Sequence, residues 1–239
     1  MRLITCHRGR LHALEEFGGG SGKKIFSSGF AAIDALLPGN GLARGAVHEI
    51  LGESGGGLPL FFAMLLARGA AGENSGAHRA IVWCDPEGLV YPPALAAAGI
   101  CLDRIYFLRP RTPRDLLWGM GESLRCPGVA AVIAAPGRLS RIEARRLQLA
   151  AETGGGAGLL LRAAPGQGRL PPHYAAATRW VVQPAPGDPT VQRWKIRLVH
   201  CHGGNLDQTI ILEHCRETNS VRAISELADR SARPKIAGA

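Results

Sequence analysis

Apolar runs of strand length alternate along the chain with segments of helical periodicity. The runs predict buried strands, because their central positions carry almost no polar residues. They span residues 45–51, 79–84, 103–110, 128–135 and 158–162. Segments with helical periodicity lie between them, at residues 60–68, 113–124 and 138–152. Strands that alternate with helices predict an α/β fold with a mostly parallel, doubly wound sheet.

Late segments of the chain alternate apolar and polar residues, which is the pattern of strands with one solvated face. They predict antiparallel strands that extend the sheet, at residues 178–182, 192–199 and 209–213. Histidine and cysteine residues lie before the last of these strands and at its end. They are His200, Cys201 and His202 before the strand, and His214 and Cys215 at its end. Their spacing matches neither C-x₂-C nor H-x₃-H, and neighbours along a strand point to opposite faces, so we expect no metal site there.

The two ends of the chain differ from its centre. The segment from Leu3 to Phe17 has apolar residues spaced between basic ones, which predicts a short amphipathic helix. This helix is expected to dock on its own core or on another chain. Gly18 to Lys24 predicts a flexible linker. Few large apolar residues follow residue 215, which predicts a basic, partly disordered tail. The predicted organisation is a helix and linker over residues 1–24, a core over 25–215 and a tail over 216–239.

Composition narrows the class of protein without identifying it. At 239 residues, of which 46% are hydrophobic, the chain is long enough for one sizeable core. The formal net charge of +9 favours an anionic partner or a protein partner with an acidic face. No apolar run approaches the roughly 20 residues that span a bilayer, and arginines interrupt the first ten residues, so we expect no signal peptide. With six scattered cysteines, a reducing, cytoplasmic setting is expected.

A glycine-rich segment joins the strand at 45–51 to the helix at 60–68, which is the context of a phosphate-binding loop. Its outer glycines stand at the spacing of G-x-x-x-x-G-K-[S/T]. The lysine that would reach the β- and γ-phosphates is replaced by Leu58, and the hydroxyl that would hold Mg²⁺ is replaced by Pro59. On spacing alone, a plain strand-to-helix turn explains the segment equally well. The segment comprises Gly52, Glu53, Ser54, Gly55, Gly56, Gly57, Leu58 and Pro59.

The residues before this loop carry a family resemblance. A Ser-Gly pair precedes a short helical segment with Asp-x-Leu-Leu, and Leu37–Leu42 then spells Leu-Pro-Gly-Asn-Gly-Leu. The strand that follows begins Gly-Ala-Val-His-Glu-Ile at residues 45–50. This order resembles the first part of a RecA-like core. The two motifs are similar to those of the ImuA family, RecA-like accessory proteins of bacterial mutagenic DNA repair, and the resemblance covers roughly residues 26–215.

The resemblance implies a RecA-like P-loop core with a degenerate phosphate loop. Glu87, with Asp85 two residues earlier, matches the carboxylate that acts as general base in RecA-like ATPases. Such a base is useful only opposite a held γ-phosphate, so we favour capping or solvent-facing roles for both. In the resembled fold the fourth strand ends in an aspartate that supports Mg²⁺, and here that position is Ala135. We therefore expect no cofactor, no metal and no catalysis.

A basic cluster follows the fourth strand directly, where recombinases carry a long DNA-binding loop. Ser140 and Glu143 predict a capping box at the start of this helix. Ile142 and Leu149 are expected to face the core. The cluster could bind an acidic partner segment or DNA phosphates, and a merely solvated basic face is the alternative. It consists of Arg138, Arg141, Arg145 and Arg146.

The function that the resemblance implies is a non-catalytic, protein-binding role in translesion synthesis, within the SOS response to DNA damage. The implied partners are an ImuB-type Y-family-like protein, an error-prone replicative-type polymerase and the RecA recombinase, with DNA contact a weaker expectation. Two alternatives stay open. One is a working ATPase in which Arg68 or Arg138 replaces the missing lysine, and the other is a damage-induced inhibitor of cell division.

Overall fold

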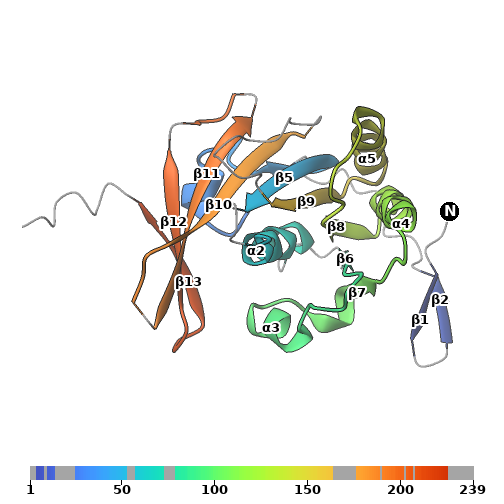
Figure 1. The fold of residues 1–239 in the computed structure, drawn as a ribbon, viewed down its shortest axis with the longest axis horizontal. Coiled ribbons are helices and arrows are strands. Elements are labelled where there is room, and N and C mark those ends of the chain that lie inside the picture. The colour runs from blue at the N-terminus through green and yellow to red at the C-terminus, as the bar shows by residue number, and fades with distance from the viewer. Residues whose placement is uncertain are drawn as a thin grey trace, which may run out of the picture.

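A nine-stranded sheet forms the centre of the molecule. The computed structural model describes residues 4–7, 10–13, 25–52, 57–72, 79–163, 176–188, 190–201, 203–206 and 208–225. Within these residues the large sheet has the strand order β13-β12-β11-β10-β5-β9-β8-β6-β7 (Figure 1). Small elements precede it: β3 (Ile25–Phe26) pairs with β4 (Leu42–Ala43), and α1 (Ala31–Asp34) lies between them.

Six neighbouring strands of this sheet run parallel, because each pair among them is joined in parallel register. They are β5 (Ala46–Gly52), β6 (Ala80–Cys84), β7 (Ile105–Leu108), β8 (Val129–Ala134), β9 (Ala157–Ala163) and β10 (Thr178–Ala185). The 3-10 turn η1 (Leu102–Arg104) leads into β7. Five of these strands coincide with the predicted apolar runs, although β7 is only partly buried. The remaining strand, β10, was predicted to be antiparallel, and this holds only for its pairing with β11, because it runs parallel to β5.

Helices cover both faces of the sheet, as a doubly wound fold requires (Figure 1). On one face α2 (Leu60–Ala71) and α3 (Pro92–Ala97) pack against one hydrophobic core. On the other face α4 (Pro113–Arg125) and α5 (Arg141–Gly154) pack against a second core. This mostly parallel sheet with late antiparallel strands is the RecA-like α/β architecture that the sequence predicted. In the described part of the chain, no helix is both long and apolar enough to cross a membrane.

Side chains cap the starts of two helices, and the capping box of α5 confirms the prediction from the sequence. The hydroxyl oxygen of Thr112 accepts a hydrogen bond from the amide of Asp115 at 3.1 Å, at the start of α4. At α5, Ser140 accepts from the amide of Glu143 at 3.2 Å, and Glu143 accepts from the amide of Ser140 at 2.7 Å. These caps satisfy main-chain donors that a helix start leaves free.

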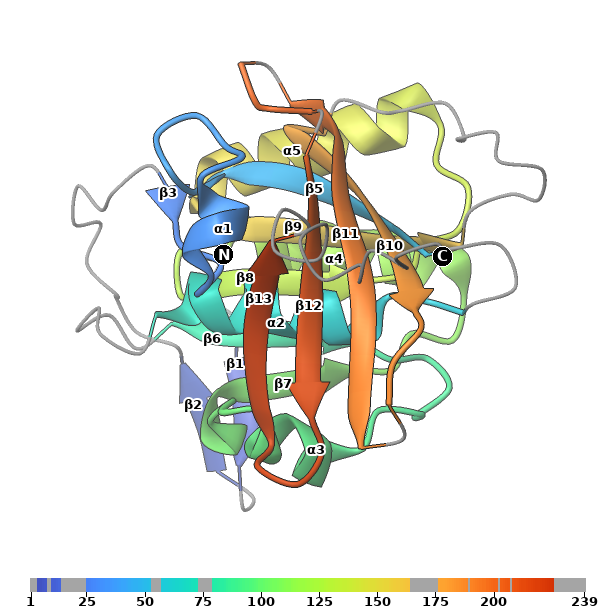
Figure 2. The same cartoon turned by 90° about the vertical axis from the view of Figure 1, so that its left-hand side faces the viewer.

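Antiparallel strands extend the sheet beyond its parallel part: β11 (Val191–Cys201), β12 (Thr209–Cys215) and β13 (Ser220–Ser225). Figure 2 shows them crossing in front of α2. The rings of Phe61 on α2 and Trp194 on β11 stack at 4.1 Å. The basic, partly disordered tail was predicted to begin at residue 216. This is wrong for the residues up to Ser225, because Val221 and Ala223 pack against the core. Residues 226–239 lie outside the described residues.

The predicted N-terminal helix is wrong in the part that the structure describes. Residues there form an antiparallel hairpin of β1 (Ile4–His7) and β2 (Arg10–Ala13), with His7 paired to Arg10. Two residues, Arg8 and Gly9, separate the paired strands in the sequence, and glycine in a two-residue connection favours a hairpin. The remainder of the predicted helix and the glycine linker, residues 14–24, lie outside the described residues.

An ion cluster joins the three antiparallel strands. The buried carboxylate of Glu213 on β12 accepts hydrogen bonds from Arg193 Nε on β11 and Arg222 Nε on β13, both at 2.7 Å. These three residues are direct cross-strand neighbours. Hydrogen bonds from the two guanidinium groups hold the pKa of Glu213 below its ordinary value of 4.5. The cluster therefore stabilises the fold at neutral pH, and its contribution is lost as the pH falls below that value.

We predict that Glu213→Gln loosens β13, because the neutral amide binds both guanidinium groups more weakly. Amide hydrogen exchange at residues 220–225 should become faster, while exchange in β5 stays as in the wild type. Glu122→Gln is the matched control, since it removes an exposed ion pair with Arg125 on α4. Unchanged exchange in β13 of the Glu213 variant would contradict the prediction.

Candidate functional site

The carboxyl ends of the parallel strands bring the predicted loop positions to one edge of the sheet. β5 leads into the glycine loop, β6 into Asp85 and Glu87, and β8 into Ala135. In the sheet, β9 lies between β5 and β8, and β6 follows β8. With about 4.8 Å between neighbouring strands, β5 and β8 lie about 10 Å apart. The fold thus places these positions along the edge where α/β proteins commonly bind ligands.

The glycine loop is described at its two ends. Glu53, Ser54, Gly55 and Gly56 lie outside the described residues. A Cβ atom on Gly52, the last residue of β5, would lie 2.2 Å from the carbonyl oxygen at residue 57. That residue, a glycine, has a φ of 76°, in the left-handed region that side chains disfavour. The close return of the chain therefore requires both outer glycines of the motif.

Two main-chain positions at the described start of α2 offer no donor to a phosphate. Phosphates bind such a loop through main-chain N–H groups at the start of the helix. Pro59 has no N–H, and the amide of Leu60 already donates to the carbonyl of Leu58 at 2.8 Å. The side chains of Leu58 and Leu60 are 40% and 42% exposed. The loop has kept its turn, but its end presents apolar surface instead of charge.

The two carboxylates after β6 have different surroundings. Asp85 is buried, and its oxygens accept the amides of Leu89 and Val90, both at 3.0 Å. Asp85 therefore stabilises the turn that follows β6. It does not cap the helix that begins after Tyr91, which has no side-chain cap. Glu87 is exposed. The pair thus consists of one structural carboxylate and one that faces solvent.

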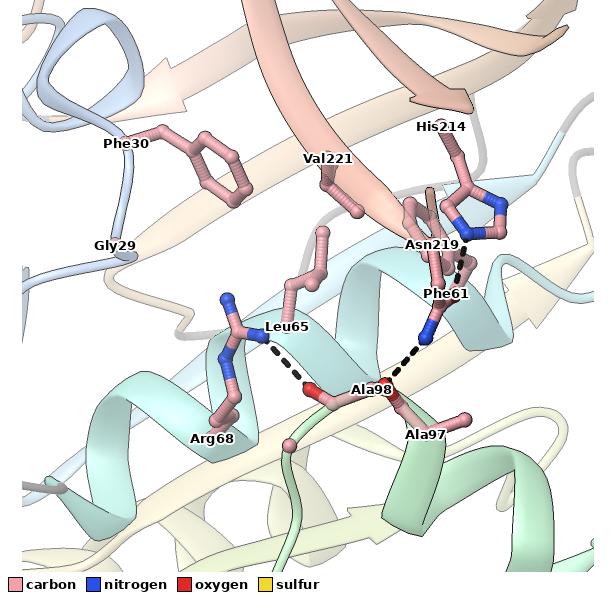
Figure 3. Close-up of a pocket in the computed structure, with 11 residues that line it drawn as sticks. Gly29, Phe30, Phe61, Leu65, Arg68, Ala97, Ala98, His214, Asn219 and Val221 are labelled. Carbon is pink, nitrogen blue, oxygen red and sulfur yellow. Dashed lines mark hydrogen bonds between the residues drawn. The ribbon is translucent and has the colours of Figure 1, made fainter. Parts of the chain in front are cut away.

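The structure gives no support at this edge for a metal ligand at residue 135 or for an arginine that replaces the missing lysine. Ala135 is exposed directly after β8 and offers no ligand. Arg68 lies in the last turn of α2, about 12 Å along the helix from its first residue. Its guanidinium donates to the carbonyl of Ala98 at 2.7 Å (Figure 3). Arg138 is exposed between β8 and α5. Within the described residues, His, Cys, Asp and Glu side chains form no group of three that could hold a metal ion.

A pocket of about 300 Å³ lies along the outer face of α2, between α3 and the turn that joins β12 to β13 (Figure 3). The polar side chains at its rim already have partners. Asn219 donates to the carbonyl of Ala97 at 2.6 Å, and its amide oxygen lies 2.8 Å from His214 Nε2. These bonds hold the β12–β13 turn against α3. We therefore interpret the pocket as the boundary between the antiparallel strands and the parallel core.

A buried ion cluster includes a residue of β5, the strand that leads into the glycine loop. The sequence analysis did not predict this cluster. Glu49 on β5 is fully buried, and its carboxylate contacts Arg162 on β9 at 3.3 Å and Arg179 on β10 at 3.0 Å. The contact with Arg179 Nε is a close ion pair without hydrogen-bond alignment. The available signal was a glutamate inside an otherwise apolar run, because a buried carboxylate needs a cationic partner. The cluster joins three neighbouring strands.

The residue before it, His48, takes part in a buried hydrogen-bond chain on the opposite face of β5. Its Nε2 lies 2.9 Å from the carbonyl oxygen of Ala43, so Nε2 carries the proton. Nδ1 must then accept from the hydroxyl of Thr178, at 2.8 Å. The oxygen of that hydroxyl accepts from Trp180 Nε1, also at 2.8 Å. Both polar residues of the Gly-Ala-Val-His-Glu-Ile motif are therefore used inside the fold.

The basic cluster on α5 is confirmed as exposed, but the predicted direction of two apolar side chains is wrong. Ile142 is 67% exposed and Leu149 is 44% exposed, whereas both were expected in the core. Small residues and one leucine form the buried face instead: Ala144, Leu147, Ala150, Ala151 and Gly154. A Cβ on Gly154 would lie 2.1 Å from the carbonyl oxygen of Leu124, so close packing against α4 sets the rotation of the helix. The exposed arginines are Arg138, Arg141, Arg145 and Arg146.

The fold is compatible with a RecA-like α/β core, and the segment at the phosphate-loop position carries neither the lysine nor the hydroxyl of that motif. A comparison with protein-family models gives no match. Among curated proteins, the chain is similar to Protein ImuA from two strains of Caulobacter vibrioides. The identity is 31% over 233 residues, which covers 90% of this chain and 94% of each relative. The chain belongs to the ImuA family.

We predict that His48 makes stability depend on pH. Burial lowers the pKa of His48 from 6.5 to about 4. Between these values the unfolded chain binds more protons than the folded chain, so stability is complete above the higher value and falls as the pH drops towards the lower one. The contribution of His48 should make unfolding about 2 kcal/mol easier at about pH 5 than at about pH 7.5.

Urea unfolding of the wild type and of His48→Gln at both pH values measures this contribution. Glutamine does not titrate, so the loss between the two pH values should be smaller in the variant, whatever the variant's stability at neutral pH. Equal losses in the two proteins would assign the pH dependence to other groups.

Proposed function

We propose that this chain is a non-catalytic accessory protein of DNA-damage-induced mutagenesis, which acts by binding other proteins in translesion synthesis. Membership of the ImuA family supports the context of mutagenic DNA repair. The observation that carries the non-catalytic part is the start of α2. There a proline and an internally bonded amide stand where a phosphate would need donors, and Leu58 stands where a lysine would reach it.

The size of the missing contacts supports weak or absent binding of a triphosphate. A charge-assisted hydrogen bond to a phosphate contributes about 1.5–3 kcal/mol. Loss of the lysine, the Mg²⁺-binding hydroxyl and the metal-supporting carboxylate removes two or three such contacts. Affinity for a triphosphate should therefore fall by a factor of about 10³ or more. The turn between Gly52 and Gly57 does not supply the binding energy that these contacts would contribute.

The proposed partners are an ImuB-type Y-family-like protein, an error-prone replicative-type polymerase and the RecA recombinase, all in the cytoplasm. A RecA-like core can present binding surfaces whether or not it hydrolyses ATP, because the chemistry uses only one edge of the sheet. The net charge of +9 also favours partners with acidic surfaces.

We predict that the purified chain does not bind ATP with micromolar affinity, with or without Mg²⁺. Isothermal titration calorimetry tests this, with a RecA recombinase under identical conditions as the positive control. Micromolar, Mg²⁺-dependent binding would overturn the non-catalytic proposal and revive the ATPase alternative.

We also predict that Glu87→Ala leaves damage-induced mutagenesis nearly unchanged in cells that carry the variant as their sole copy. The carboxylate is exposed, and a general base has no role without a held γ-phosphate. Asp85→Ala is the informative contrast, because it leaves two amides without their acceptor and should destabilise the fold by about 1–3 kcal/mol. Lost mutagenesis in the Glu87 variant, at normal protein level and melting temperature, would contradict the prediction.

A further inference from the structure

The outward face of α5 carries two large apolar side chains that the fold does not use. Ile142 and Leu149 are 67% and 44% exposed. They lie seven residues apart, which places them on the same side of the helix about 10 Å apart along its axis. Arg145 lies between them, three residues after the first and four before the second. Spacings of three, four and seven residues are those by which helices recognise one another.

The opposite side of α5 is already complete. Its buried residues pack against the sheet and α4, and Gly154 allows the two helices to approach closely. Exposed isoleucine and leucine therefore add nothing to this core. Single exposed apolar residues are ordinary on protein surfaces. Two of them aligned on one helical stripe, with mostly positive charges around them, form a pattern that fits a partner.

The charges around this stripe are predominantly positive. Between residues 138 and 154 the chain carries four arginines and two glutamates. Glu143 is held by the capping box, and Glu152 forms an exposed pair with Arg145 at 3.7 Å. Arg141 occupies the first position of the helix, where the helix dipole disfavours a cation. Arg141 therefore does not stabilise the start of α5. Arg145 and Arg146 lie near Glu152 and Glu143, and their exposed guanidinium groups can still meet an acidic partner.

We infer that the stripe of Ile142, Arg145 and Leu149, with Arg141 and Arg146 beside it, docks an acidic amphipathic helix of a partner protein. Acidic residues of that helix would pair with the arginines, and its apolar residues would cover the isoleucine and leucine. DNA phosphates would engage the arginines but leave the apolar side chains exposed, so the surface fits a protein better than DNA. The inference rests on the proposed protein-binding function and names the surface and the chemistry of its partner.

The test separates the apolar part of the surface from its charges. One variant carries Ile142→Ser with Leu149→Ser, and the other carries Arg141→Ser, Arg145→Ser and Arg146→Ser. The control carries Leu89→Ser with Arg114→Ser, which are exposed on other elements. All variants should melt as the wild type does. Binding of each full chain to the purified ImuB-type protein of the same genome is measured by calorimetry, and binding to a fluorescent single-stranded oligonucleotide by polarisation.

Both surface variants should bind the protein partner at least about tenfold more weakly, equivalent to about 1.4 kcal/mol, and the control should bind as the wild type. If the wild type binds but the Ile142/Leu149 variant binds equally well, the docking surface is overturned. If only oligonucleotide binding falls, and only in the arginine variant, the surface binds phosphates and the inference is also overturned. If the wild type binds no partner protein at all, the proposed function fails first.

Discussion

The buried carboxylate of Glu49 needs a compensating positive charge when the central sheet forms. The order of the strands beside β5 depends on which residues supply that charge. Arg162 and Arg179 supply the compensating charges from the two strands on either side of β5. Removal of one partner from a buried ion pair typically costs about 3–5 kcal/mol, because the remaining charge is left without compensation. The ion cluster therefore permits only an arrangement in which β9 and β10 flank β5. His48 bonds to Thr178 of β10 on the other face of β5, so both faces of the loop-bearing strand are held.

This arrangement explains how the strand–loop–helix unit is kept although its charged residues are absent. In a working phosphate loop, binding energy from the nucleotide and its metal helps to order the loop. Here internal contacts account for the position of β5, and the tight approach of Gly52 to Gly57 accounts for the turn. The Gly-Ala-Val-His-Glu-Ile motif is thus structural: its polar residues stabilise the sheet and do not contact a ligand.

The sequence predicted five of the six parallel strands, the strands β11 and β12 and the capping box of α5, because apolar runs, alternating patterns and Ser-x-x-Glu depend on neighbouring residues alone. It predicted β10 as antiparallel, and pairing with the distant β5 makes this strand part of the parallel core. It failed where packing between distant segments decides. Ile142 and Leu149 are more apolar than the alanines of α5, but close approach to α4 at Gly154 turns the alanines inward. β13 was missed because its short segment acquires its order from cross-strand pairing with β12. At the candidate site, the lost loop residues could be read directly, whereas the partners of Glu49 lie more than a hundred residues away.

The edge where phosphate-loop ATPases bind triphosphates has different chemistry in this chain. Leu58 and Leu60 expose apolar surface at the start of α2, and Arg138 and Arg141 stand where the chain leaves β8 for α5. Both segments follow carboxyl ends of parallel strands, so they belong to the same side of the sheet. Exposed apolar groups do not bind a hydrated Mg²⁺–phosphate, whereas an acidic protein helix supplies both apolar side chains to cover them and carboxylates to pair with the arginines. The edge thus lacks the lysine, the hydroxyl and the carboxylate that nucleotide chemistry uses, and the arginines between β8 and α5 give the proposed protein-binding surface its positive charge.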